Sequence, residues 1–165
     1  MGITKRSDRL AFCAVAGADT TTYKRMTNFT EMSISKNPKE YTRQYVDEAF
    51  ERSDVVGYAP SISYSFDHDA ENEVHGIFTD ISDNERVGDA AKVSIIIVEL
   101  DKEKSPGEAS FVAIKRDFSV IPDSEGGETD AYTYGGTLKA NGDITFGSAV
   151  STDGWQTITF TADED

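Results

Sequence analysis

Alternation of large and small side chains is the feature that most limits what this chain can fold into. Over residues 58–66 the large, mostly apolar side chains fall on one face: Tyr58, Pro60, Ile62, Tyr64 and Phe66. The small side chains fall on the other: Ala59, Ser61, Ser63 and Ser65. A period of two residues is typical of a strand with one buried face. We therefore predict a half-buried strand here, with an outer face that is small and polar.

Other segments carry strand signals of the same kind. Met26, Met32 and Ile34 share one face of residues 26–35, opposite Glu31. Phe29 interrupts that alternation, which indicates a bulge or a contact with another subunit. Asn141-Gly142 is typical of a tight turn and predicts a hairpin between 132–139 and 143–148. Residues 155–161 predict a final strand.

One strand must be buried on both faces. Residues 93–100, VSIIIVEL, are apolar on both sides and need cover on each. The preceding segment offers that cover, because Val74, Ile77, Phe78 and Ile81 recur with helical spacing. Asp69 is the predicted N-cap. We therefore predict a single, mainly β domain over 1–165: an antiparallel sandwich or barrel-like fold with one flanking α-helix at about residues 70–82.

Residues 36–57 have no pattern of a stable core, and we predict a long protruding loop. A loop of this length is uncommon in a compact domain unless it has a function. Its aromatic and arginine side chains are of the types enriched at protein interfaces. A flexible surface loop is one interpretation, and an intersubunit arm is the favoured one. The candidate contact residues are Tyr41, Arg43, Tyr45, Phe50 and Arg52.

The charge of the chain argues against a nucleic-acid-binding groove. The net charge is −14, with 30 acidic and 16 basic residues, and such a field repels nucleic acid. It is compatible with a surface over which DNA slides, although plain solubility is the more general explanation of an acidic chain. We expect no membrane insertion, and Met1–Arg9 lacks the apolar stretch of a signal peptide. Cys13, the single cysteine, lies in the apolar run Leu10–Ala16 and is predicted to be a buried thiol.

No constellation of residues predicts catalysis. His68 and His75 lie near several carboxylates, but their spacing fits no known metal-ligand loop, and an acidic helix N-terminus explains it. The chain has neither a glycine-rich phosphate loop nor a Gly-x-Ser-x-Gly motif. We therefore expect no enzyme activity, no cofactor and no metal site.

The order of segments resembles a known family. Residues 26–67, then VSIIIVEL, then FVAIKRDFSVIPDSEGG at 111–127, and finally YGGTLKANGDITFG and GWQTITF look like the major tail tube proteins of long-tailed, siphovirus-type bacteriophages. The likeness covers nearly the whole chain. The likeness lies in the order of the segments and in their residue patterns, and it includes no diagnostic catalytic motif.

The resemblance implies a structural role in a virion tail that is assembled in the host cytoplasm. Subunits of such a family close into hexameric rings that stack into a hollow tube, with neighbouring sheets joined around the lumen. The long loop and the termini would make contacts between rings. Expected partners are further copies of the chain and the tape measure, tail terminator and distal tail proteins.

DNA would only pass through the lumen of such a tube. A face without cations or aromatic platforms would let it pass quickly. We expect the lumen-facing residues to be Glu31, Ser61, Ser63 and Ser65. Two other functions stay open: the inner tube of a contractile tail or phage-tail-like bacteriocin, and a β-sandwich carbohydrate-binding module.

Overall fold

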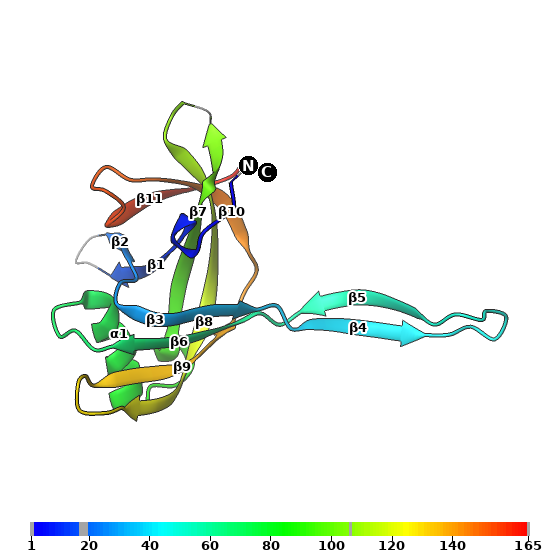
Figure 1. Cartoon of the computed structure of the whole chain (residues 1–165), viewed down its shortest axis with the longest axis horizontal. Coiled ribbons are helices and arrows are strands. Elements are labelled where there is room, and N and C mark those ends of the chain that lie inside the picture. The colour runs from blue at the N-terminus through cyan, green and yellow to red at the C-terminus, as the bar shows by residue number, and fades with distance from the viewer. Residues whose placement is uncertain (1, 17–19, 106, 165) are drawn as a thin grey trace.

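The computed structural model describes residues 2–16, 20–105 and 107–164. In these residues the chain is mainly β, with one α-helix against a large antiparallel sheet (Figure 1). The strands are β1 (Arg9–Ala16), β2 (Thr21–Arg25), β3 (Phe29–Ser35), β4 (Pro38–Arg43), β5 (Arg52–Tyr58), β6 (Ser61–Asp67), β7 (Lys92–Ser105), β8 (Ser110–Gly126), β9 (Thr133–Ala140), β10 (Thr145–Val150) and β11 (Thr157–Ala162). The helix is α1 (Glu73–Asp83), and two short 3₁₀ turns are η1 (Arg6–Asp8) and η2 (Gly88–Ala91).

Six strands of the described chain close into a barrel. The order of the main sheet is β10-β11-β2-β1-β7-β8-β9-β6-β3, and β10 also pairs with β8. That second pairing joins the ends of the first six strands, while β9, β6 and β3 extend from β8 as a wing. The barrel is filled by apolar side chains, with one aromatic ring among them: Leu10, Phe12, Ile96, Val98, Ala113, Ala149 and Ile158. The sandwich or barrel-like prediction is confirmed.

Strand β7 is buried on both faces, as VSIIIVEL predicts. Ile96 and Val98 point into the barrel, whereas Val93 and Ile95 belong to a second core under the wing and the helix. Successive side chains of a strand point to opposite faces, so one strand serves two cores. Because β7 is buried on both faces, it contributes to the core of the barrel and to the core under the wing, and so joins the two.

Helix α1 covers the second core with its apolar stripe. Val74, Phe78 and Ile81 are buried against it. The N-cap is Asn72, whose Oδ1 accepts the amides of Val74 at 3.0 Å and His75 at 3.2 Å. The prediction of Asp69 as the cap was wrong, because its carboxylate instead accepts the amide of Glu71 in the preceding turn.

His75 is fully buried on this helix and holds two segments together. Its Nδ1 accepts the amide of Asp69 at 3.0 Å, so Nε2 carries the proton and donates to the carbonyl of Thr27 at 2.8 Å. Its ring lies 4.3 Å from that of Phe66, centroid to centroid. Burial lowers the pKa of His75 below its usual 6.5, with the Thr27 carbonyl opposing the shift.

The lowered pKa of His75 predicts that the fold loses stability in acid. The unfolded chain binds a proton at His75 at a higher pH than the folded chain, so His75 lowers the stability of the fold as the pH falls below about 6.5. We expect the melting temperature to fall between pH 7.5 and 5.5, and His68→Gln to keep that dependence. The His75 ring signals in an NMR titration test the cause. A His75 that titrates at or above 6.5 would contradict it.

The predicted hairpin at Asn141-Gly142 was wrong. Strand β9 pairs with the second part of β8 and with β6, whereas β10 pairs with the first part of β8 and with β11. Strand β8 spans 17 residues, long enough for both partners to lie end to end along one edge. The turn at Asn141-Gly142 therefore connects two strands, β9 and β10, that both pair with β8. The amide of Asn141 donates to the carbonyl of Asp117.

The wing strands follow the alternation closely. In β6, Ile62, Tyr64 and Phe66 are buried, and the serines between them are on the other face. A register shift at Phe29 in β3 confirms the bulge, and its ring packs 4.9 Å from Phe66. Tyr58 does not share the core face as predicted: it ends β5 and is 61% exposed.

Candidate assembly surfaces

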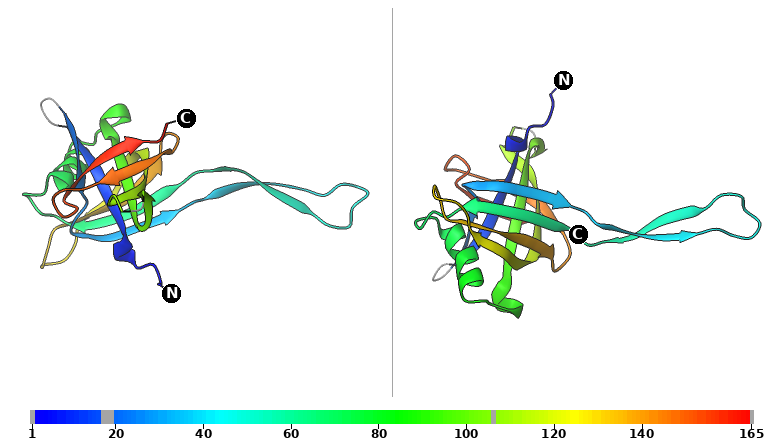
Figure 2. Two further views of the ribbon diagram at one scale, coloured as in Figure 1. Left: turned by 90° about the horizontal axis from the view of Figure 1, so that it is seen from above. Right: turned by 60° about the horizontal axis from the view of Figure 1, so that its bottom comes forward.

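The segment 36–57 leaves the body as a two-stranded arm. Strands β4 and β5 pair with each other and form a sheet separate from the main one. Figure 1 shows the arm continuing lengthwise from β3 and β6, with α1 at the opposite end of the body. Both views in Figure 2 show it clear of the other strands. The protrusion is as predicted, but most of it is a paired ribbon rather than an irregular loop.

The root of the arm is fastened to the wing. The side-chain amide of Asn37 donates to the carbonyl of Ala59 at 3.0 Å and to Oγ of Ser61 at 3.1 Å. The amide of Ala59 in turn donates to the carbonyl of Lys36. Residues 36–37 and 59–60 therefore link the arm to the wing, and hydrogen bonds between these two links hold the root of the arm in place.

Four of the five predicted arm residues form one cluster. Arg43 lies over the rings of Tyr41 and Tyr45, 5.0 and 5.7 Å from their centroids, and Arg52 lies 5.8 Å from that of Tyr45. Arg43 also pairs with Asp54 at 2.7 Å, and this hydrogen bond, with a smaller contribution from Tyr45, raises the pKa of Arg43 above its usual value. Guanidinium groups over aromatic rings help to stabilise a paired ribbon that has no core of its own. Phe50 lies apart, in the turn.

The arm displays apolar side chains that have no cover in the described chain. Val46 and Phe50 stand in the turn between the strands, and Phe50 is 82% exposed. Val55, Val56 and Tyr58 are exposed on β5, which the sequence analysis missed although the run Val55-Val56 was a visible signal. Apolar side chains gathered on one projecting element mark an interaction site more than isolated exposed ones do.

The four residues predicted to face a lumen lie together on the outer face of the wing. Glu31 is directly opposite Ser65 in the register of β3 and β6, and Ser63 is opposite Ser33. Ser61 is opposite Lys139 of β9. Directly paired residues point to the same side of a sheet. Glu31, Ser61, Ser63 and Ser65 therefore share a surface, turned away from the core.

The sequence analysis missed the rest of this face, which β9 and β8 supply. Across the sheet, Thr137 and Lys139 of β9 are paired with Ser63 and Ser61 of β6. Lys139 is paired in turn with Ser119 of β8. The expectation of a face without cations is wrong, because Lys139 belongs to it. By the same registers Asp67 of β6 and Lys92, paired with Ser119, also lie on this face, which therefore carries charges of both signs.

Strand β3 is the open edge of the wing. It pairs with β6 on one side, and no described strand pairs with its other side. Part of that edge is occupied from η1, because Nη2 of Arg6 donates to the carbonyl of Met32 at 3.3 Å. An edge strand with unpaired backbone groups is a template for a strand of another molecule.

The described ranges hold no group of three or more His, Cys, Asp or Glu residues placed to bind a metal ion. None of their helices is long and apolar enough to cross a membrane. Cys13 is buried, as predicted, and burial raises the pKa of its thiol to about 12, which leaves it protonated.

Comparison with known proteins finds likeness at the level of structure. No family model and no curated protein matches the sequence. The tail of an empty gene transfer agent particle, solved with C6 symmetry, is similar with a TM-score of 0.63 at 11% identity, covering 87% of this chain and 98% of the other. A virion of a native gene transfer agent matches with a TM-score of 0.59, 11% identity and the same coverage. A chain of the anti-feeding prophage baseplate has a TM-score of 0.46 at 10% identity, covering 88% and 97%. The first two likenesses show a shared fold.

Proposed function

We propose that this chain is a structural subunit of a phage-type tail, and that it polymerises as stacked hexameric rings into a hollow tube. One observation carries the proposal: a body with a closed barrel projects a two-stranded arm whose apolar side chains are uncovered. Such an arm needs a partner molecule. The fold shared with a gene transfer agent tail of C6 symmetry supports a ring of six.

In this proposal the outer face of the wing lines the lumen. Glu31, Ser61, Ser63 and Ser65 would face passing DNA, and their small polar side chains offer bases no stacking surface. The open edge of β3 would receive a strand of the neighbouring subunit, so that the wings join around the channel.

The remaining roles follow from that assignment. The tube would lie in the tail of the virion after assembly in the host cytoplasm, with tape measure, tail terminator and distal tail proteins as further partners. It would deliver DNA without catalysis and without a cofactor. A siphovirus-type tail is the favoured setting, and the inner tube of a contractile tail or bacteriocin is the alternative. Co-purification of a sheath protein with the tubes would identify the latter.

Electron microscopy of the concentrated, purified protein tests the proposal. We expect hollow tubes with six-fold symmetry, and a reconstruction with Ser63 on the inner wall. A chain that stays monomeric at high concentration and occurs in no tubular particle would refute the function. Tubes with Ser63 on the outer wall would refute only the orientation of the wing.

A further inference from the structure

An apolar groove runs between the wing and the barrel. The main sheet bends so far along β1-β7-β8-β9-β6-β3 that β3 and β6 lie across from β1 and β7. The central part of the groove encloses about 250 Å³. Its walls are Arg6, Arg9, Leu10, Ala11, Met32, Ile34, Ile62 and Ile97.

The groove is longer than its central part. Two further depressions share walls with it, one toward Arg25 and Phe29 and the other toward Lys36 and Arg116. Ile34, Ile62 and Ile97 are common to the central part and the second of these. These three isoleucines form an apolar floor that runs through both of those parts.

Basic side chains flank this floor in a chain whose net charge is −14. Arg6, Arg9 and Arg25 lie toward one end, and Lys36 and Arg116 toward the other. A groove with apolar walls and cationic ends selects an occupant that is apolar and acidic.

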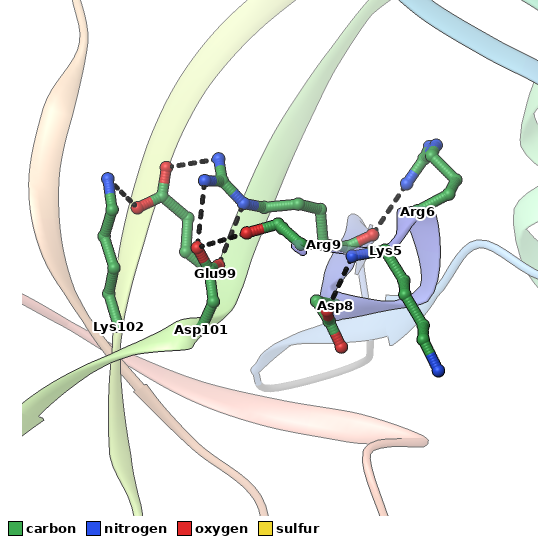
Figure 3. A network of polar contacts seen from close by, with 8 residues as sticks. Lys5, Arg6, Asp8, Arg9, Glu99, Asp101 and Lys102 are labelled. Carbon is green, nitrogen blue, oxygen red and sulfur yellow. Dashed lines mark hydrogen bonds and ion pairs between the residues drawn. The ribbon is translucent and has the colours of Figure 1, made fainter. Parts of the chain in front are cut away.

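Within the described chain Arg9 is the only one of these arginines that forms an ion pair. Arg9 pairs with Glu99 at 2.8 Å and with Asp101 at 3.0 Å (Figure 3). The Arg6 guanidinium donates only to backbone carbonyls, that of Arg9 at 2.7 Å and that of Met32 at 3.3 Å. Nε of Arg116 is buried and finds no hydrogen-bond acceptor in the described chain. Arg6 is exposed and reaches only carbonyl oxygens, so it can take a carboxylate at one end, and the unsatisfied Nε of Arg116 favours an acceptor at the other.

The turn of the arm has the matching composition. Between β4 and β5 it carries Val46 and Phe50 as exposed apolar side chains, with Asp47, Glu48 and Glu51 beside them. Glu48 forms an ion pair with Arg52, while Asp47 and Glu51 form none in the described structure. The tip is thus apolar and acidic where the groove is apolar and basic.

The arm cannot reach the groove of its own subunit. Strand β4 alone carries the tip about 20 Å from the wing at 3.3 Å per residue, and the bonds of Asn37 fix the direction of the root. Figures 1 and 2 show the tip pointing away from the body in every view. Any occupant with this chemistry must come from a second molecule.

We propose that the groove between β1 and β3 receives the arm tip of another copy of this chain, with Phe50 and Val46 on the isoleucine floor and Asp47 and Glu51 toward its arginines. This inference rests on the proposed function and names the acceptor for the arm. The contact is heterologous, because tip and groove are different surfaces, and such contacts propagate into rings or open helical assemblies.

Directed cross-linking tests the pairing. Because Cys13 is the only cysteine and is buried, an introduced pair can be oxidised without interference. In Phe50→Cys/Ile34→Cys, each subunit carries one cysteine at its tip and one in its groove. Mild oxidation of the assembled protein should give a covalent ladder in steps of 18.1 kDa, as should Phe50→Cys/Met32→Cys. The control Val87→Cys/Ile34→Cys should give no ladder, since Val87, also 82% exposed, lies beyond the helix.

The outcomes separate this inference from the proposed function. Tubes of both double variants that yield no ladder would overturn the groove as acceptor and leave the tube standing. A ladder from the Val87 control alone would place the groove against a different surface. Absence of any assembly by the unmodified chain would refute the proposed function itself.

A substitution gives a second readout without oxidation. Phe50→Asp should raise the protein concentration needed for assembly by about tenfold or more, because buried aromatic side chains dominate contacts of this kind. Val87→Asp should assemble like the unmodified chain. Equal behaviour of the two variants would contradict a role for Phe50.

Discussion

Deletion of the arm tip, roughly Glu40–Arg52, should leave a folded monomer that forms no long tubes. The two strands of the arm form their own sheet, and neither buried core takes a residue from it. The fold should therefore survive, with a melting temperature close to that of the full chain. The contacts that the tip would make with other copies are lost together. Circular dichroism measures the first result and negative-stain electron microscopy the second.

The deletion also has a result that would contradict it. Tubes of normal length from the shortened chain would show that the arm is dispensable, whatever its composition. A shortened chain that unfolds would contradict the separation of arm and core. Phe50→Asp then tests the tip without shortening the chain.

Phe66→Ala should cost about 3–5 kcal/mol of the free energy of unfolding, the largest effect that we expect from one side chain. Phe66 is fully buried at the centre of an aromatic cluster. Its ring lies 4.3 Å from that of His75, 4.9 Å from Phe29 and 5.5 Å from Tyr134, centroid to centroid. Removing it leaves a cavity shared by β3, β9 and α1. Chemical denaturation measures the loss.

Phe146 provides the matched control for that substitution. It also lies on a strand of the main sheet, but it is 59% exposed. Phe146→Ala should therefore change the free energy of unfolding by no more than about 0.5 kcal/mol. Comparable losses for Phe66→Ala and Phe146→Ala would contradict the placement of the wing core.

Much of the core could be predicted from local pattern. The alternation of Ile62, Tyr64 and Phe66 places β6, and the double-faced run of β7 predicts cover on two sides. Each of these signals depends only on which side chains of a single strand lie on its two faces. The bulge at Phe29 was visible for the same reason, since a break in alternation is a local event.

Features set by partner choice could not be predicted in this way. Asn141-Gly142 has the local chemistry of a hairpin, but β8 is long enough to pair with both flanking strands. Asn72 displaced Asp69 as the cap because the amides of Val74 and His75 lie within its reach. Turn and cap propensities are weak beside tertiary pairing.

The candidate surfaces likewise combine features that local pattern predicts with features that depend on strand pairing. The serine face follows from strand alternation, whereas Lys139 joins it only through the register of β6 with β9. The aromatic and arginine content predicts a contact role for the arm, but its ribbon form depends on pairing between β4 and β5. The groove has no sequence signature, because its walls come from η1, β1, β3, β6 and β7.

The fastened root of the arm has a mechanical consequence. Since β4 follows β3 and β5 leads into β6 through cross-bonded residues, a displacement at the tip would act on the same two strands that carry Glu31, Ser63 and Ser65. In the proposed tube, a subunit bound at its arm tip would thereby be coupled to the strands proposed to line the lumen.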